Sequence, residues 1–80
     1  MAEQSMPLAM VRPGETVSVV GIVGGRGLAR RLTDMGLTPG VKVKVVNNHM
    51  PGPVMIELRG SKVALGHGVS QKIMVIGVRM

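Results

Sequence analysis

Apolar and polar residues alternate along much of the chain. Val17 and Val19, for example, alternate with the polar residues Thr16 and Ser18. A period of two residues is typical of a β-strand that buries one face and exposes the other. The sequence therefore predicts five strands, in residues 16–22, 41–45, 54–58, 61–65 and 72–78. The side chains predicted to fill the core between these strands are Val17, Val19, Val43, Val45, Ile56, Leu65, Ile73 and Val75.

A different spacing of apolar residues follows a glycine-rich turn. Leu28, Leu32 and Met35 recur at intervals of four and three residues, so they would lie on one face of a short α-helix. Gly36 then stands where a left-handed residue commonly ends a helix, and Leu37 follows as its apolar contact. Because two turns of helix are not stable alone in water, we expect this helix to pack on the strands, with Leu32 over the core.

Gly and Pro mark the connections between these elements. Residues 38–41 read Thr-Pro-Gly-Val and fit a type II turn, with Pro second and Gly third. Arg59 and Gly60 form a two-residue connection, so the strands that flank them should pair as a hairpin. Residues 47–53 are predicted to form a loop, and residues 66–71 a turn or a single turn of 3₁₀ helix.

Length and composition limit the fold. Eighty residues make one small domain, and a hydrophobic content of 45% is enough for its core. None of these residues is aromatic, so Val, Leu, Ile and eight Met must fill the interior. Short strands and one short helix predict an all-β fold, a small five-stranded barrel. Residues 1–7 are expected to form a flexible tail and residues 8–80 the folded domain.

The chain carries a formal net charge of +6. A basic surface suits nucleic acid, an anionic membrane or an acidic protein face, and it also suits solubility alone. Nucleic-acid binding is disfavoured, because single strands are usually bound by stacking on aromatic side chains, which the chain lacks. No segment approaches the about 20 apolar residues of a membrane helix. With neither Cys nor an export signal in view, we expect a cytoplasmic protein.

The sequence contains no pattern of catalytic or metal-binding residues. Its Ser and Thr lack plausible His and Asp partners, and its carboxylates are scattered. His49 and His67 are the two imidazoles, and neither has the spaced ligands that a zinc or iron site requires. Met50, beside His49, would suit copper(I) better than ferrous iron. We therefore expect no enzyme activity, no cofactor, no small-molecule substrate and no tight metal site.

An ordered series of short motifs resembles the family of ferrous iron transport protein A (FeoA). The most specific part is residues 31–40, Arg-Leu-Thr-Asp-Met-Gly-Leu-Thr-Pro-Gly, and the likeness extends from residue 8 to residue 78. It departs from the family pattern at residues 66–70, where Gly-His-Gly-Val-Ser replaces Arg and acidic residues. The other matching motifs are Leu8, Pro13-Gly14, Gly21-Ile22, Gly24-Gly25, Pro51-Gly52-Pro53-Val54, Gly60, Val63-Ala64-Leu65 and Ile73-Met74-Val75.

This resemblance implies an SH3-like barrel, a domain type also found at the C-terminus of iron-dependent repressors. It implies a non-catalytic accessory role in bacterial ferrous iron uptake. The expected partner is FeoB, a membrane iron permease with a cytoplasmic GTPase domain, which the protein would bind and modulate. It would then contact the membrane only through that partner. The alternative function is a regulatory or nucleic-acid-binding SH3-like module of the repressor type.

The charged residues of the predicted helix are the candidate partner-binding site. Arg26, Arg30, Arg31 and Asp34 form the densest charge cluster of the chain. The apolar stripe of this helix is expected to face the barrel, which leaves its charged faces free to meet a partner. The competing interpretation is a solvated helix face with no partner.

Overall fold

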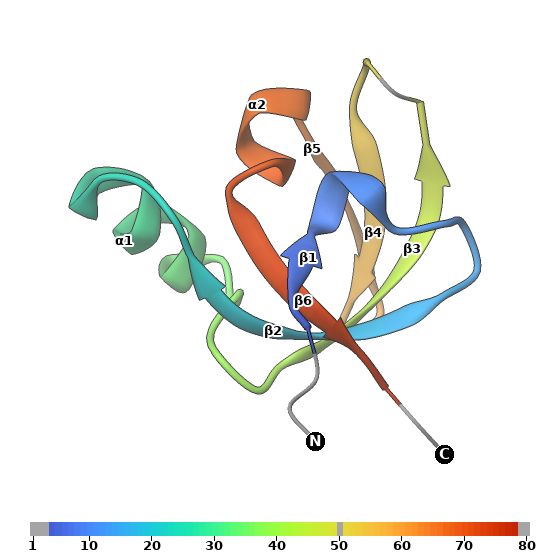
Figure 1. The fold of residues 1–80 in the computed structure, drawn as a ribbon, viewed down its shortest axis with the longest axis horizontal. Helices are drawn as coiled ribbons and strands as arrows, with labels where there is room; N and C mark the ends of the chain where they lie inside the picture. The colour runs from blue at the N-terminus through green and yellow to red at the C-terminus, as the bar shows by residue number, and fades with distance from the viewer. Residues whose placement is uncertain (1–3, 50, 79–80) are drawn as a thin grey trace.

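A computed structural model of the chain describes residues 4–49 and 51–78 (Figure 1). Residues 1–3 of the expected tail, Met50, and residues 79–80 of the expected domain lie outside the described residues. Helix α1 (Arg26–Asp34) is the longest helix, and the shorter ones are η1 (Leu8–Met10) and α2 (His67–Ser70). The strands are β1 (Met6–Pro7), β2 (Thr16–Ile22), β3 (Lys42–Asn48), β4 (Val54–Leu58), β5 (Ser61–Leu65) and β6 (Ile73–Gly77).

The strands form one antiparallel sheet in the order β1-β6-β2-β3-β4-β5. The sequence predicts an all-β fold with one short helix, and the structure is mostly β with one helix, α1, that is longer than a single turn. The predicted number of five strands is wrong, because the sheet has six. Within the described residues, β1 and β5 are not paired with each other, so closure of the sheet into a barrel is not detected. The sixth strand is β1, where Met6 pairs with Val75 and Pro7 with Met74.

Strand β1 also corrects the expected N-terminal tail, which was to extend to residue 7. Two residues are too few to show a period of two, so the sequence pattern gives no sign of this strand. Pro7 is compatible with it, because β1 lies at an edge of the sheet, where a residue without a backbone N–H is tolerated. The folded unit therefore includes Met6 and Pro7.

The alternation of apolar and polar residues located the other strands well. Strands β2, β4 and β5 have the predicted bounds. Strand β3 runs on to Asn48, past the predicted start of the loop, because the register shifts between Val45 and Asn47 and the pairing with β4 then continues. As a result, the loop between β3 and β4 is shorter than the sequence predicts.

The hydrophobic core agrees with the prediction. All eight predicted core side chains, and Leu32 over them, are at most 4% exposed. The core also takes in apolar residues that the pattern did not single out. These are Leu8, Val11, Leu37, Val54 and Leu58.

The end of α1 has the predicted glycine cap. Gly36 has a φ of +98°, and its N–H donates a 2.9 Å hydrogen bond to the carbonyl of Thr33. The N–H of Leu37 donates to the carbonyl of Leu32, also at 2.9 Å. This pair of bonds is a Schellman motif, and it turns Leu37 into the core, where it is fully buried. Leu32 and Leu37 therefore anchor the C-terminal end of α1.

The hairpin of β4 and β5 has the predicted two-residue turn. Arg59 has a φ of 53° and Gly60 a φ of 83°. Positive φ at both central residues is the requirement of a type I′ turn, whose twist matches that of the paired strands. The turn sets the register of the hairpin, in which Leu58 lies opposite Ser61 and Val54 opposite Leu65.

Candidate functional site

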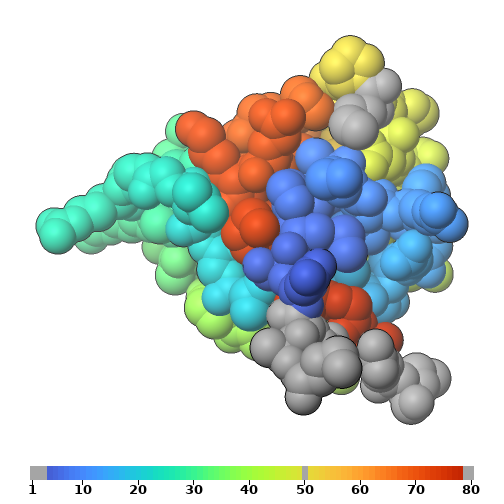
Figure 2. Space-filling model, in the orientation of Figure 1, coloured from blue at the N-terminus to red at the C-terminus, as the bar shows by residue number. Residues whose placement is uncertain are grey.

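Helix α1 projects from one side of the molecule (Figures 1 and 2). The four candidate residues, Arg26, Arg30, Arg31 and Asp34, all lie on α1, and all are exposed. Since residues four apart lie above one another on a helix, Arg26, Arg30 and Asp34 follow one stripe. Arg31 lies beside that stripe, toward the apolar face. All four residues therefore lie on α1, with Arg26, Arg30 and Asp34 on one stripe and Arg31 between that stripe and the apolar face.

Arg31 is at the edge of an apolar groove between α1 and the corner where β5 leads into α2. The groove has a volume of about 240 Å³. Arg31 is the charged residue among those that line it, so the groove combines an apolar floor with a cationic rim. Its lining consists of Leu28, Arg31, Leu32 and Met35 from the helix side, and Ala64, Leu65, Gly66 and Val69 from the corner.

The groove corrects the expectation that the whole apolar stripe of the helix packs against the sheet. Leu32 does so and is 3% exposed. Leu28 is half-buried, and Met35 is 43% exposed. Leu28 still packs against the core, so Met35 is the member of the stripe that the core leaves uncovered, and both residues line the groove. The helix therefore offers a partner apolar contacts as well as charges.

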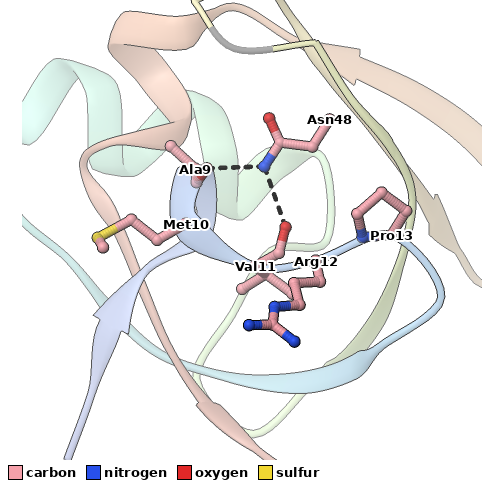
Figure 3. Close-up of a pocket in the computed structure, with 6 residues that line it drawn as sticks. All are labelled: Ala9, Met10, Val11, Arg12, Pro13 and Asn48. Atoms are coloured by element: carbon pink, nitrogen blue, oxygen red, sulfur yellow. Dashed lines mark hydrogen bonds between the residues drawn. The ribbon is translucent and has the colours of Figure 1, made fainter.

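A second and more open hollow lies beside η1 (Figure 3). It has a volume of about 350 Å³ and is lined by Ala9, Met10, Val11, Arg12, Pro13 and Asn48. The side-chain amide of Asn48 donates to the carbonyl of Ala9 at 2.7 Å and to that of Val11 at 3.0 Å. These two bonds tie η1 to the end of β3, so we assign Asn48 a structural role. This role could not be predicted from the sequence, because asparagine is common in loops and Asn48 lay in a predicted loop.

No group of three or more His, Asp or Glu is placed to hold a metal ion within residues 4–49 and 51–78. The Nδ1 atom of His67 is buried without a hydrogen-bond partner, as is Oδ1 of Asn48. Among the described helices, none is long and apolar enough to cross a membrane.

The chain therefore folds as a small antiparallel sheet from which one helix with three arginines projects. Residues 6–76 match the model of the FeoA domain family, and the chain belongs to this family. This membership agrees with the expectation that the protein is not an enzyme. A protein of Methanocaldococcus jannaschii with the provisional name Fe(2+) transport protein A is 46% identical over 69 residues, which cover 86% of this chain and 83% of that protein.

Solved structures agree with this assignment. The crystal structure of an iron uptake regulatory protein, FeoA, has a TM-score of 0.83 and 35% identity, and the match covers 94% of this chain and 99% of that one. A FeoA-like protein from Clostridium acetobutylicum has a TM-score of 0.82 and 26% identity, with coverage of 100% and 93%. A manganese-dependent transcriptional repressor has a TM-score of 0.87 at 20% identity, covering 98% of this chain but 44% of its own. This last likeness concerns the fold alone.

Proposed function

We propose that the protein is a non-catalytic, cytoplasmic accessory of ferrous iron uptake that binds a FeoB-type permease through the face of α1. Arg26, Arg30, Arg31 and Asp34 are the proposed contacts. The observation that carries the proposal is that exposed charges and an apolar groove meet at Arg31 on this helix. Buried apolar contacts with a polar rim are the usual composition of a protein interface.

The family assignment supports the choice of partner. The chain belongs to the FeoA domain family, and its relative in Methanocaldococcus jannaschii bears the name of a Fe(2+) transport protein. The net charge of +6 favours an acidic surface on the partner. Arginine can pair with a carboxylate through two parallel hydrogen bonds, which lysine cannot do. The alternative of nucleic-acid binding gains no specific support, because the likeness to the repressor is one of fold.

The test is a binding measurement between the full chain and membranes that contain the permease, with and without guanine nucleotide. Arg30→Glu combined with Arg31→Glu should weaken binding, and raising the salt concentration should weaken the wild-type complex. The control is Lys42→Glu combined with Lys44→Glu. Both lysines are exposed on β3, and this pair changes the net charge by the same amount.

The two double variants separate a specific site from overall charge. A larger loss for the α1 variant supports the proposal. An equal loss for both variants would show that only net charge matters, and the assignment to α1 would then be wrong. Wild-type protein that fails to bind these membranes in either nucleotide state would refute the proposed partner itself. The circular dichroism spectrum of each variant checks that the fold is intact.

A further inference from the structure

Strand β5 is an unpaired edge of the sheet within the described residues. It pairs with β4 on one side, and the sheet order ends there. An edge strand has a row of free backbone N–H and C=O groups along its outer side, which can pair with another extended chain. The opposite edge, β1, is only two residues long, so β5 is the longer available edge.

The turn of the hairpin decides which residues of β5 have these free groups. In a two-residue hairpin the residues that flank the turn exchange backbone hydrogen bonds, and bonded and non-bonded pairs then alternate. Ser61, Val63 and Leu65 are therefore bonded to β4. Lys62 and Ala64 direct their backbone N–H and C=O groups away from the sheet. Both residues are exposed.

The free edge lies at the groove described above. Ala64 and Leu65 line the groove on one side, and Leu28 and Met35 of α1 line it on the other. An extended segment paired with β5 would therefore pass along the groove. Since successive side chains of a strand point to opposite faces, one of its side chains could enter the groove while its backbone is held by Lys62 and Ala64.

Charge indicates what kind of segment fits. The floor of the groove is apolar, whereas Arg31 at its rim and Lys62 on the edge strand are basic. An apolar residue flanked by carboxylates would match both. A second copy of this chain would match poorly, because pairing of two β5 edges would bring like-charged Lys62 side chains close together, an arrangement that discourages edge-to-edge pairing.

We propose that β5 binds an extended, acidic segment of a partner protein by strand addition, with one apolar side chain of that segment held in the groove between β5 and α1. The proposal rests on the function proposed above, because it specifies how the permease would be recognised. Backbone bonds to Lys62 and Ala64 provide affinity, and the groove provides the preference for particular side chains.

The decisive variant is Ala64→Pro in the full chain. Proline lacks the N–H that the bound segment would use, and it is tolerated on an edge strand where that N–H faces away from the sheet. Ala64→Val is the matched control, because valine is of similar bulk and keeps the N–H. We expect Ala64→Pro to weaken binding by about tenfold, the effect of one lost hydrogen bond, relative to Ala64→Val.

Hydrogen exchange of the wild-type protein provides a second measurement that needs no variant. The amides of Lys62 and Ala64 should exchange quickly in the free protein and slowly in the complex. Two probes are used. One is the cytoplasmic domain of a FeoB-type permease, and the other is a synthetic nine-residue peptide, acetyl-Asp-Asp-Thr-Val-Leu-Val-Thr-Asp-Asp-amide.

The outcomes distinguish this proposal from the proposed function. If the peptide protects both amides and the permease domain does not bind, strand addition is supported and the permease is the wrong partner. If the permease domain binds without protecting these amides, and Ala64→Pro binds as well as Ala64→Val, the proposed function is retained and strand addition is refuted. Binding of neither probe refutes the proposal. Protection that rises with protein concentration alone would identify a second copy as the occupant and would also refute it.

Discussion

Replacing Arg59 should stabilise the protein, because the turn between β4 and β5 holds this residue in an unfavourable conformation. Arg59 is the non-glycine residue with positive φ, 53°, among those described. For an L-amino acid with a Cβ atom, this left-handed region costs roughly 1–2 kcal/mol, and Asn tolerates it best after Gly. Asn-Gly is the preferred pair for a type I′ turn, and Gly60 already supplies its second residue.

We expect Arg59→Asn to raise the free energy of unfolding by about 1 kcal/mol. For a domain of this size, that gain corresponds to a rise of roughly 4–8 °C in the midpoint of thermal unfolding. Arg59→Gly should gain less, since glycine gives the unfolded chain additional conformational freedom, an effect of roughly 0.5–1 kcal/mol. Arg59→Ala removes the charge but keeps the strained conformation, so it should leave stability nearly unchanged.

Urea and thermal unfolding followed by circular dichroism measure this order of stability. If Arg59→Ala stabilises the protein as much as Arg59→Asn, the gain comes from the loss of a positive charge on a basic chain, and the conformational explanation is wrong. If Arg59→Asn has no effect, the turn holds Arg59 without strain. Because Arg59 lies outside the groove and α1, the Asn variant should bind the partner as the wild type does.

Three further substitutions test the core, η1 and α1. Leu32→Ala removes the buried side chain of α1 and should cost roughly 2–5 kcal/mol in urea unfolding, about half of the roughly 4–12 kcal/mol expected for 80 residues. A loss below about 1 kcal/mol would show that α1 is not anchored there. Asn48→Ala leaves the carbonyls of Ala9 and Val11 without their side-chain donor and should lower the free energy of unfolding by about 1–3 kcal/mol. An unchanged unfolding midpoint would show that water replaces the amide. Arg26→Glu should raise the free energy of unfolding by up to about 1 kcal/mol, because a negative charge suits the N-terminus of a helix, and the thermal midpoint should rise with it. The same variant should weaken partner binding. A variant that is less stable, or that binds as the wild type does, contradicts this reasoning.

Local patterns in the sequence predicted the strands and the core, because a half-buried strand imposes its period on its own residues. The alternation gave the bounds of β2, β4 and β5, the Pro39-Gly40 turn leads from α1 into β3, and the Arg59-Gly60 turn joins β4 to β5. Strand β1 was not predicted, because it is only two residues long and pairs with β6, which lies near the other end of the chain. The position of β5 at an edge of the sheet was not predictable for the same reason, because the order of the strands depends on pairing between residues far apart in the sequence.

The candidate site was predictable only in part. The charges of α1 can be located from the sequence, because a helix fixes the directions of its own side chains. The groove cannot, because it depends on the distance between Leu28 on α1 and Ala64 on β5, which no local pattern specifies. The expected packing of Met35 failed for the same reason. A stripe of apolar residues shows that a helix buries one face, but it does not show how much of that face the sheet covers.

The charges at the two ends of α1 bear on the proposed role of this helix. Arg26 is its first residue and Asp34 its last, so each charge opposes the helix dipole at its own end. Gly25 at the N-cap makes no side-chain capping bond, and Gly27 occupies the first turn, where alanine would be more favourable. Local rules of stability are most often broken at functional sites. Arg31 in the last turn and the Gly36 cap favour the helix, so the unfavourable charges are those of Arg26 and Asp34 at its two ends. The proposed contacts on the exposed face of α1 would account for these two charges.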